Sequence, residues 1–360
     1  MWNVCIGTYT EPILFGTGQV FHGKGKGISL CLFQNGSLHC LSSLSVRNPS
    51  FLCVDERRKT IYAVNELKSY LGKNGGGCTA IAYQENGNMR ILDTIAVGGA
   101  DPCHIAESPN GEFLGIANFA SGSVSVIPLD EGGHLAKERI KVFQHTGRGA
   151  DAKRQNGPHA HSVLFAPYGR KMIVPDLGTD KLMIYRFDGS SVMPEKGASY
   201  EVKSGSGPRF GEFSADGKHF YLVNELGCTV THFLVDENGL QEKETHTTLP
   251  WRNGIDNICS DLHLTPDGKF LYVSNRGHDS ICCFSILGDG SLAFKSIYPC
   301  GGKTPRSFAI DPLGSYMLVG NQDSDTISVF SIGSDGRLCL VNQVEFETPV
   351  CIKFIKNQEC

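Results

Sequence analysis

Residues 258–292 read ICSDLHLTPDGKFLYVSNRGHDSICCFSILGDGSL, and residues 304–338 read TPRSFAIDPLGSYMLVGNQDSDTISVFSIGSDGRL. Each stretch contains an apolar strand, a turn with Gly, a second strand that ends in Asn-X, a polar loop, a third strand and an Asp-Gly turn. A fourth strand follows each Asp-Gly turn. Asn-Gly and Asp-Gly between alternating strands are strong hairpin signals. The repeated unit is therefore predicted to be a four-stranded antiparallel sheet.

The second turn of this unit recurs along the whole chain. Its seven copies are Asn35-Gly36, Asn86-Gly87, Gly132-Gly133, Asp188-Gly189, Asn238-Gly239, Asp289-Gly290 and Asp335-Gly336. From Gly36 to Gly336 is 300 residues over six intervals, which gives a mean period of 50 residues. Four-stranded units at this period are typical of β-propeller blades.

The first turn of the unit has one copy fewer. Its six copies are Arg57-Arg58, Asn110-Gly111, Tyr168-Gly169, Asp216-Gly217, Asp267-Gly268 and Leu313-Gly314. The missing copy falls between the two ends of the chain, because residues 350–355 look like an innermost strand and residues 4–9 look like the second strand of the same blade. We predict an all-β fold with almost no helix, in which residues 1–360 form a single seven-bladed β-propeller closed by N- and C-terminal strands that share one blade. Two β-sandwiches or a solenoid would not explain these turn counts.

Composition argues against several classes of protein. The net charge of -4 disfavours a nucleic-acid platform, and no run approaches the roughly 18 apolar residues that a membrane helix needs. The N-terminus lacks the pattern of a signal peptide, which predicts a cytoplasmic location. Several of the 14 Cys, such as Cys31, Cys282 and Cys351, lie on strand-like alternations and are predicted to be reduced, buried thiols.

The geometry of a blade predicts where polar residues meet. The start of the first strand lies beside the end of the second, since the two are antiparallel neighbours, and both open onto one face near the channel. The seven first-strand positions are Ser50, Cys103, His161, Arg209, Ser260, Arg306 and Val350. The seven second-strand positions are Tyr9, Glu66, Phe119, Asp176, Glu225, Arg276 and Gln322.

These positions carry different residues in different blades, and many of them are ionisable. Arginine favours bidentate recognition of carboxylate or phosphate, so the mouth is predicted to bind a small anionic substrate. His161 is the natural proton carrier near neutral pH, with Glu225 as base or as orienting group. The predicted catalytic residues are His161, Glu225, Arg276 and Arg209. The predicted substrate-binding residues are His159, Arg306, Glu66, Gln322, Asp176 and His104. The alternative is a solvated rim whose charges mean little.

Other chemical motifs are weak. The pair His159 and His161 has metal-ligand spacing, but no third ligand is evident, although His104 and His263 are possible. The glycine-rich residues 72–77 lack the ending of a phosphate-binding loop, and no nucleophile elbow is present. We therefore predict neither a metal nor a cofactor.

Four stretches carry a resemblance to a known family. They are residues 157–161 (GPHAH), 207–209 (GPR), 223–226 (VNEL) and 274–280 (SNRGHDS). With the rest of the chain they resemble the lactonase family of seven-bladed propellers, which includes cycloisomerase-type 6-phosphogluconolactonase and 3-carboxy-cis,cis-muconate lactonizing enzyme. The resemblance implies a site formed by His161, Arg209, Glu225 and Arg276. Family members often continue Pro-Arg with His, whereas this chain has Phe210.

The resemblance also implies an activity. It points to a carboxylic ester hydrolase that opens a sugar-acid lactone, 6-phosphoglucono-1,5-lactone above all, to give 6-phosphogluconate in the pentose phosphate pathway of glucose metabolism. A carboxy-muconate lactonizing cycloisomerase and a non-catalytic binding propeller remain as alternatives. Which of His159 and His161 carries the proton stays open, and so does the oligomeric state.

Overall fold

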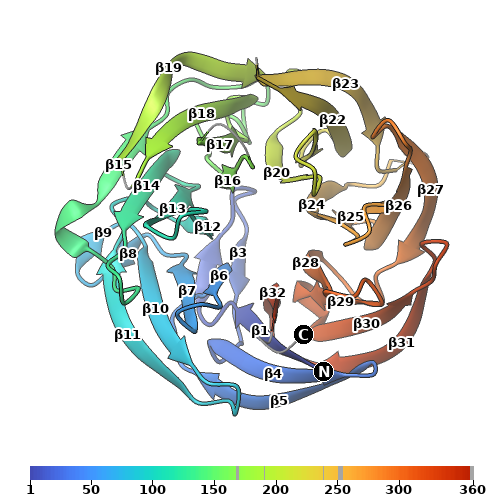
Figure 1. The fold of residues 1–360 in the computed structure, drawn as a ribbon, viewed down its shortest axis with the longest axis horizontal. Helices are drawn as coiled ribbons and strands as arrows, with labels where there is room; N and C mark the ends of the chain where they lie inside the picture. The colour runs from blue at the N-terminus through green and yellow to red at the C-terminus, as the bar shows by residue number, and fades with distance from the viewer. Residues whose placement is uncertain (168–169, 190, 238, 250–253, 357–360) are drawn as a thin grey trace.

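The computed structural model describes residues 1–356 except 168, 169, 190, 238 and 250–253. Figure 1 shows seven sheets arranged around a central axis, and each is a four-stranded antiparallel blade. Two short 3-10 turns, η1 (Lys137–Arg139) and η2 (Gln322–Ser324), are the helical elements of the described residues. The predicted fold class is thus confirmed. The predicted turns at Tyr168-Gly169 and Asn238-Gly239 involve residues outside the described part.

The first three blades follow in ring order, each from its innermost strand outward. The blade that holds both termini consists of β32 (Pro349–Ile355), β1 (Trp2–Thr8), β4 (Ile28–Gln34) and β5 (Ser37–Leu44). The second consists of β6 (Leu52–Asp55), β7 (Thr60–Asn65), β10 (Gly77–Tyr83) and β11 (Met89–Ala96). The third consists of β12 (Pro102–Glu107), β13 (Phe113–Asn118), β14 (Ser123–Pro128) and β15 (Lys141–Gln144).

The last four blades continue the ring. The fourth consists of β16 (Leu164–Phe165), β17 (Lys171–Asp176), β18 (Lys181–Asp188) and β19 (Ser191–Glu201). The fifth consists of β20 (Pro208–Phe213), β21 (His219–Asn224), β22 (Thr229–Asp236) and β23 (Gly239–Thr247). The sixth consists of β24 (Ile258–Leu264), β25 (Phe270–Arg276), β26 (Ser280–Ile286) and β27 (Leu292–Pro299). The seventh consists of β28 (Pro305–Ile310), β29 (Tyr316–Asn321), β30 (Thr326–Ile332) and β31 (Leu338–Glu345).

The ring closes within the first blade, as the split termini predicted. β1 pairs with β32 on one side and with β4 on the other, so that Ile6 lies opposite both Ile352 and Ser29. Pairing the two ends of the chain leaves no free edge at the closure. Apolar side chains fill the spaces between blades, and Cys31, Cys282 and Cys351 are fully buried among them as free thiols.

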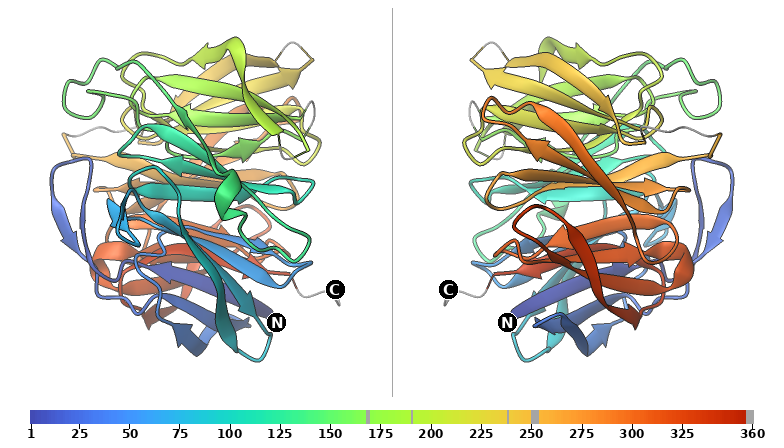
Figure 2. Two further views of the ribbon diagram at one scale, coloured as in Figure 1. Left: turned by 90° about the vertical axis from the view of Figure 1, so that its left-hand side faces the viewer. Right: turned by 90° about the vertical axis from the view of Figure 1, so that its right-hand side faces the viewer.

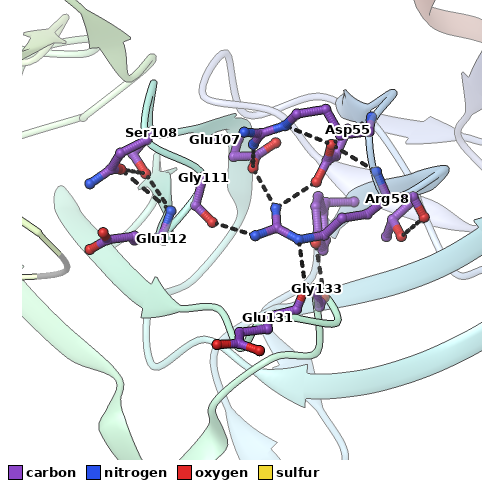
Figure 3. Close-up of polar contacts among 12 residues, drawn as sticks. Asp55, Arg58, Glu107, Ser108, Gly111, Glu112, Glu131 and Gly133 are labelled. Atoms are coloured by element: carbon purple, nitrogen blue, oxygen red, sulfur yellow. Dashed lines mark hydrogen bonds and ion pairs between the residues drawn. The ribbon is translucent and has the colours of Figure 1, made fainter.

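In the turn between β6 and β7, Arg57-Arg58 takes the place of Asp-Gly. Polar contacts of Arg58 connect this turn of the second blade to the third blade. The Arg58 guanidinium lies 2.6 Å from Asp55 Oδ2 and 3.0 Å from Glu107 Oε1, and it also donates to the carbonyl of Gly111 (Figure 3). This turn therefore joins neighbouring blades as well as connecting two strands.

Two short hairpins interrupt the repeat and were not predicted. β2 (Pro12–Leu14) pairs with β3 (Val20–His22), and β8 (Ser69–Tyr70) pairs with β9 (Lys73–Asn74). Figure 2 shows the blue β2–β3 hairpin projecting from the face of the ring opposite the N-terminus. None of the described residues forms a helix long and apolar enough to cross a membrane.

Candidate active site

One pocket at the ring axis collects residues from all seven blades, and six of the seven predicted first-strand positions line it. Its first-strand residues are Ser50, Cys103, His161, Arg209, Arg306 and Val350. The seventh position, Ser260, lies just outside this lining and links two of the arginines. Its carbonyl accepts a hydrogen bond from Arg209, and its hydroxyl donates to the carbonyl of Arg306 at 2.6 Å. The predicted convergence of these blades on one opening is therefore present.

Glu225 is the centre of the charged cluster beside this pocket. Its carboxylate accepts hydrogen bonds from Arg154 at 2.6 Å, Arg209 at 2.9 Å and Arg276 at 2.9 Å. Burial alone would raise the pKa of Glu225, but the three guanidinium groups outweigh it and hold that pKa well below its usual range. One carboxylate does not balance three guanidinium groups, so the cluster keeps an excess of positive charge.

His161 follows Ala160, which bridges to Asp176, and its backbone N–H donates to Pro175 O at 2.9 Å. The side chain is 8% exposed, with Nε2 3.9 Å from Glu225 Oε2 and Nδ1 3.9 Å from Cys103 Sγ. Burial lowers the pKa of His161 well below its usual range, and Arg209 and Arg306 lower it further. The imidazole is consequently neutral at physiological pH and can accept a proton.

Arg306 occupies the opposite side of the pocket. Its guanidinium carbon lies 5.2 Å from the centre of the Tyr9 ring and 5.4 Å from that of Phe15, at cation–π distance. Tyr9 donates a hydrogen bond to Glu66 at 2.8 Å, and burial raises the pKa of Glu66. Among the described residues, none forms an ion pair with Arg306, although Glu66 and Glu225 lie close enough to raise its pKa. Arg306 is thus a cation held mainly by aromatic rings.

An aromatic layer closes the inner end of the pocket. The rings of Phe51 and His104 lie 4.1 Å apart, and those of His104 and Phe210 lie 5.6 Å apart. All three residues also line a second hollow formed by the later parts of the first strands. Burial lowers the pKa of His104 well below its usual range, so this ring packs as a neutral group. Phe210 therefore serves as part of a wall.

A half-buried ion pair lies next to this layer. Asp261 lines the pocket, and its Oδ1 is 3.5 Å from Nε2 of His263, whose Nδ1 is 3.0 Å from Glu212 Oε2. Burial would lower the pKa of His263, but Asp261 and Glu212 raise it to about 9. His263 is accordingly a cation held between two carboxylates.

Comparison with known proteins agrees with this geometry. Residues 3–354 match the family model described as lactonase, 7-bladed beta-propeller. The chain belongs to this lactonase family. It is 33% identical over 306 residues to a 6-phosphogluconolactonase of Formosa agariphila, covering 80% of this chain and 83% of the relative. It is 31% identical over 315 residues to the 6-phosphogluconolactonase of Bacillus subtilis, covering 86% and 87%. The predicted family and enzyme class are thereby confirmed.

A solved structure shares the complete ring of this lactonase. The periplasmic gluconolactonase of Pseudomonas aeruginosa superposes with a TM-score of 0.89 at 30% identity, and the match covers 99% of both chains. The whole propeller, including its closure, is therefore common to the two proteins.

Gln322 and His159 are not among the residues that line the lactonase pocket. Gln322 is buried, its Nε2 donates to Asp323 at 2.8 Å, and its Oε1 has no partner among the described residues. The His159 ring stacks on Phe119 at 4.5 Å and contacts the Phe119 carbonyl through Nδ1 at 2.9 Å. Both side chains remain candidates for the rim of the site.

Asp176 is displaced by one residue from its predicted place. The bridge between Ala160 and Asp176 corresponds to the pairing of Pro208 with Asn224, so Asp176 matches Asn224 and not Glu225. Its Oδ1 accepts backbone N–H groups from His159, Gly178 and Thr179, and its Oδ2 lies 2.6 Å from His145 Nδ1. The predicted equivalence was wrong because Asp176 lies eight residues after Tyr168, whereas the corresponding residues of the other blades, Glu225 among them, lie nine residues after the first residue of their turn, so Leu177 holds this position.

The sequence reasoning also missed Arg154, which lies in a loop outside the repeat. The Asp151 carboxylate accepts the Arg154 N–H at 3.0 Å, and the Gln155 side chain donates to the Leu177 carbonyl and to Asp180, both at 2.8 Å. These bonds fix the loop against blade four and aim Arg154 at Glu225. The one available signal was the polar run at residues 151–156, which follows no strand pattern.

No group of three or more His, Cys, Asp or Glu side chains in the described part of the chain has a geometry suited to a metal ion. The site is accordingly described by its imidazole, carboxylate and guanidinium groups.

Proposed function

We propose that this lactonase hydrolyses a sugar-acid lactone and that its substrate is 6-phosphoglucono-1,5-lactone, which it converts to 6-phosphogluconate. The observation that supports this most is that the neutral, buried His161 imidazole lines one pocket with Arg209 and Arg306, beside a cluster in which three guanidinium groups share the Glu225 carboxylate. Such a pocket supplies a base and attracts an anion. The names of the two bacterial relatives favour the phosphorylated substrate.

His161 acts as the general base in this proposal. It takes a proton from a water molecule as the water oxygen bonds to the lactone carbonyl carbon. The bond from that carbon to the ring oxygen then breaks, and the same proton passes to the ring oxygen, which becomes a hydroxyl. The product is a carboxylic acid that releases its proton to solvent.

Arg306 is assigned to the carbonyl oxygen, where negative charge develops. The Arg306 guanidinium lines the pocket and is held mainly by the rings of Tyr9 and Phe15. It can therefore stabilise an oxyanion with little rearrangement of its own side chain. Arg209 is already bonded to Glu225 and Ser260, so it positions Glu225.

Arg154 and Arg276 are assigned to the phosphate. Both are bonded to Glu225 through one terminal nitrogen, and their side chains keep 15% and 12% exposure. Unused donors on two neighbouring guanidinium groups suit an anion with several oxygens.

A lactonase assay on wild type and His161→Gln tests the proposal. We expect the variant to lose about a hundredfold or more in kcat, as for other general bases, with an unchanged melting temperature. His39→Gln, on an exposed position of β5, is the matched control. Turnover of His161→Gln within about twofold of wild type would reject His161 as the base.

The substrate is tested on wild type alone. Hydrolysis of 6-phosphoglucono-1,5-lactone above its spontaneous rate supports the assignment. If the protein converts a carboxylated muconate and does not hydrolyse 6-phosphoglucono-1,5-lactone, it is a cycloisomerase and the proposed lactone substrate is wrong. Binding of 6-phosphogluconate without turnover of either compound would identify a binding propeller. The cytoplasmic location also stays a proposal.

A further inference from the structure

Two thiols face each other on the outer strands of the first blade. The pairing of β4 with β5 sets Cys31 opposite Cys40, next to a β-bulge. Cys31 is fully buried, whereas Cys40 is exposed. Directly opposed residues of an antiparallel pair have Cα atoms about 4.5–5.5 Å apart, within the range that a disulfide spans.

Hydrogen-bond donors surround the Cys40 sulfur. Ser43 Oγ lies 3.9 Å from it, and Ser29 Oγ lies 2.8 Å from Ser43 Oγ. The Cys31 thiol, and then the Ser29 and Ser43 hydroxyls, lower the pKa of Cys40 to about 6, although burial opposes them. A thiolate is the form of cysteine that attacks peroxides.

The Cys40 sulfur is also accessible. It lines a crevice between the first and seventh blades together with Ser29 and Ser43 on one side and Ser324 and Phe346 on the other. Lys26 lies in the same crevice, and its Nζ is 3.8 Å from Glu347. A small polar oxidant can therefore reach Cys40 while Cys31 stays shielded behind it.

We propose that Cys40 and Cys31 form a reversible oxidation site for hydroperoxides. The Cys40 thiolate attacks one peroxide oxygen, which gives Cys40 sulfenic acid and releases hydroxide when the oxidant is hydrogen peroxide. The Cys31 thiol then attacks the Cys40 sulfur, so that the disulfide forms and water leaves. Two electrons pass from the two thiols to the peroxide, and an external dithiol restores the starting state.

This site is separate from the lactone pocket. Neither cysteine is among the residues that line that pocket, and β5 is the outermost strand of its blade. Oxidation at this position is expected to leave lactone hydrolysis within about twofold of the reduced enzyme. The oxidation site can therefore be tested independently of the proposed activity.

Cys339 offers an internal control because it is the other exposed thiol of the described residues, and it lies opposite Ser331 and not opposite a thiol. The full-length protein is labelled with iodoacetamide near neutral pH and each cysteine is followed by peptide mass spectrometry. We expect Cys40 to react about tenfold faster than Cys339. Hydrogen peroxide should then give a Cys31–Cys40 cross-linked peptide that dithiothreitol removes.

Three variants separate the roles of the thiols. Cys339→Ser should keep the cross-link, and Cys31→Ala should leave Cys40 as a sulfenic acid that dimedone traps. Cys40→Ser, an exposed substitution that leaves the core intact, should abolish both products. Equal alkylation of Cys40 and Cys339, with no cross-linked peptide at peroxide concentrations that oxidise Cys339, would overturn the proposal.

Discussion

Nε2 of His161 lies 3.9 Å from Oε2 of Glu225, which is beyond hydrogen-bonding distance. Glu225 is instead bonded to three arginines, and it acts on His161 only through space. The two residues therefore do not form a base with an orienting carboxylate. Glu225 sets the positions of the three guanidinium groups bonded to it, while burial, and then Arg209 and Arg306, keep the imidazole neutral.

The pH dependence of activity should reflect this environment. Because burial, Arg209 and Arg306 lower the pKa of His161, the neutral base persists below the ordinary histidine pKa of about 6.5. We expect kcat/KM to stay level as the pH falls to that value and to decline only at lower pH. A profile of initial rates between about pH 4.5 and 8 measures this. An acid limb centred at or above the ordinary value would contradict it.

Replacing Glu225 by Gln should destabilise the protein strongly. The substitution leaves three clustered guanidinium groups without their counter-ion, and breaking a buried ion pair costs about 3–5 kcal/mol. Urea unfolding measures the loss. Glu11→Gln is the control, since the ion pair of Glu11 with Arg47 is exposed and should contribute less than about 1 kcal/mol. Equal losses for the two variants would show that the arginines do not depend on Glu225.

Arg154 and Arg148 come from one loop but should behave differently. Arg154→Ala removes a guanidinium bonded to Glu225, and we expect kcat/KM to fall about tenfold to a hundredfold, mainly through KM. Arg148 is exposed, so Arg148→Ala should change kcat/KM less than about twofold. Steady-state kinetics on the phosphorylated lactone compare them. Similar losses in both variants would indicate a general effect of positive charge at the rim.

Much of the fold was predictable because each blade carries its own turn signals. The count of Gly turns from Gly36 to Gly336 fixed the number of blades, and residues 350–355 revealed the closure. The first-strand positions could also be aligned, since their spacing to the turns is regular. His161, Arg209 and Arg306 accordingly line one pocket.

The remaining parts depend on contacts outside the repeat. Arg154 reaches Glu225 from a loop whose path is set by Gln155 and Asp180, and neither bond is visible in a periodic pattern. Asp176 was misplaced by one residue because a conspicuous carboxylate, and not the regular spacing of nine residues that leads to Leu177, was taken as the end of the second strand. Phe15 belongs to an inserted hairpin that no turn count locates, although its ring contacts Arg306.

Phe15→Ala should weaken the site through Arg306. Removing one of the two rings against this guanidinium forfeits a cation–π contact of about 0.5–2 kcal/mol, which corresponds to a loss of about twofold to thirtyfold in kcat/KM. Leu14→Ala is the control, because Leu14 lies on the same hairpin and is 45% exposed. Equal kcat/KM values for Phe15→Ala and Leu14→Ala would mean that the hairpin supports the site only through its backbone and not through the Phe15 ring.

The half-buried His263 should make stability depend on alkaline pH. Its folded pKa of about 9 exceeds the unfolded value of about 6.5, so its contribution is complete below 6.5 and is lost as the pH rises through 9. We expect His263→Gln to be destabilised by roughly 3 kcal/mol near pH 6, with a difference from wild type that shrinks steadily toward pH 10. Urea titrations at several pH values measure this difference, and His22→Gln, on the hairpin strand β3, controls for an exposed histidine. A difference that is constant with pH would mean that His263 is neutral between Asp261 and Glu212, and that the polar bridge is held by ordinary hydrogen bonds.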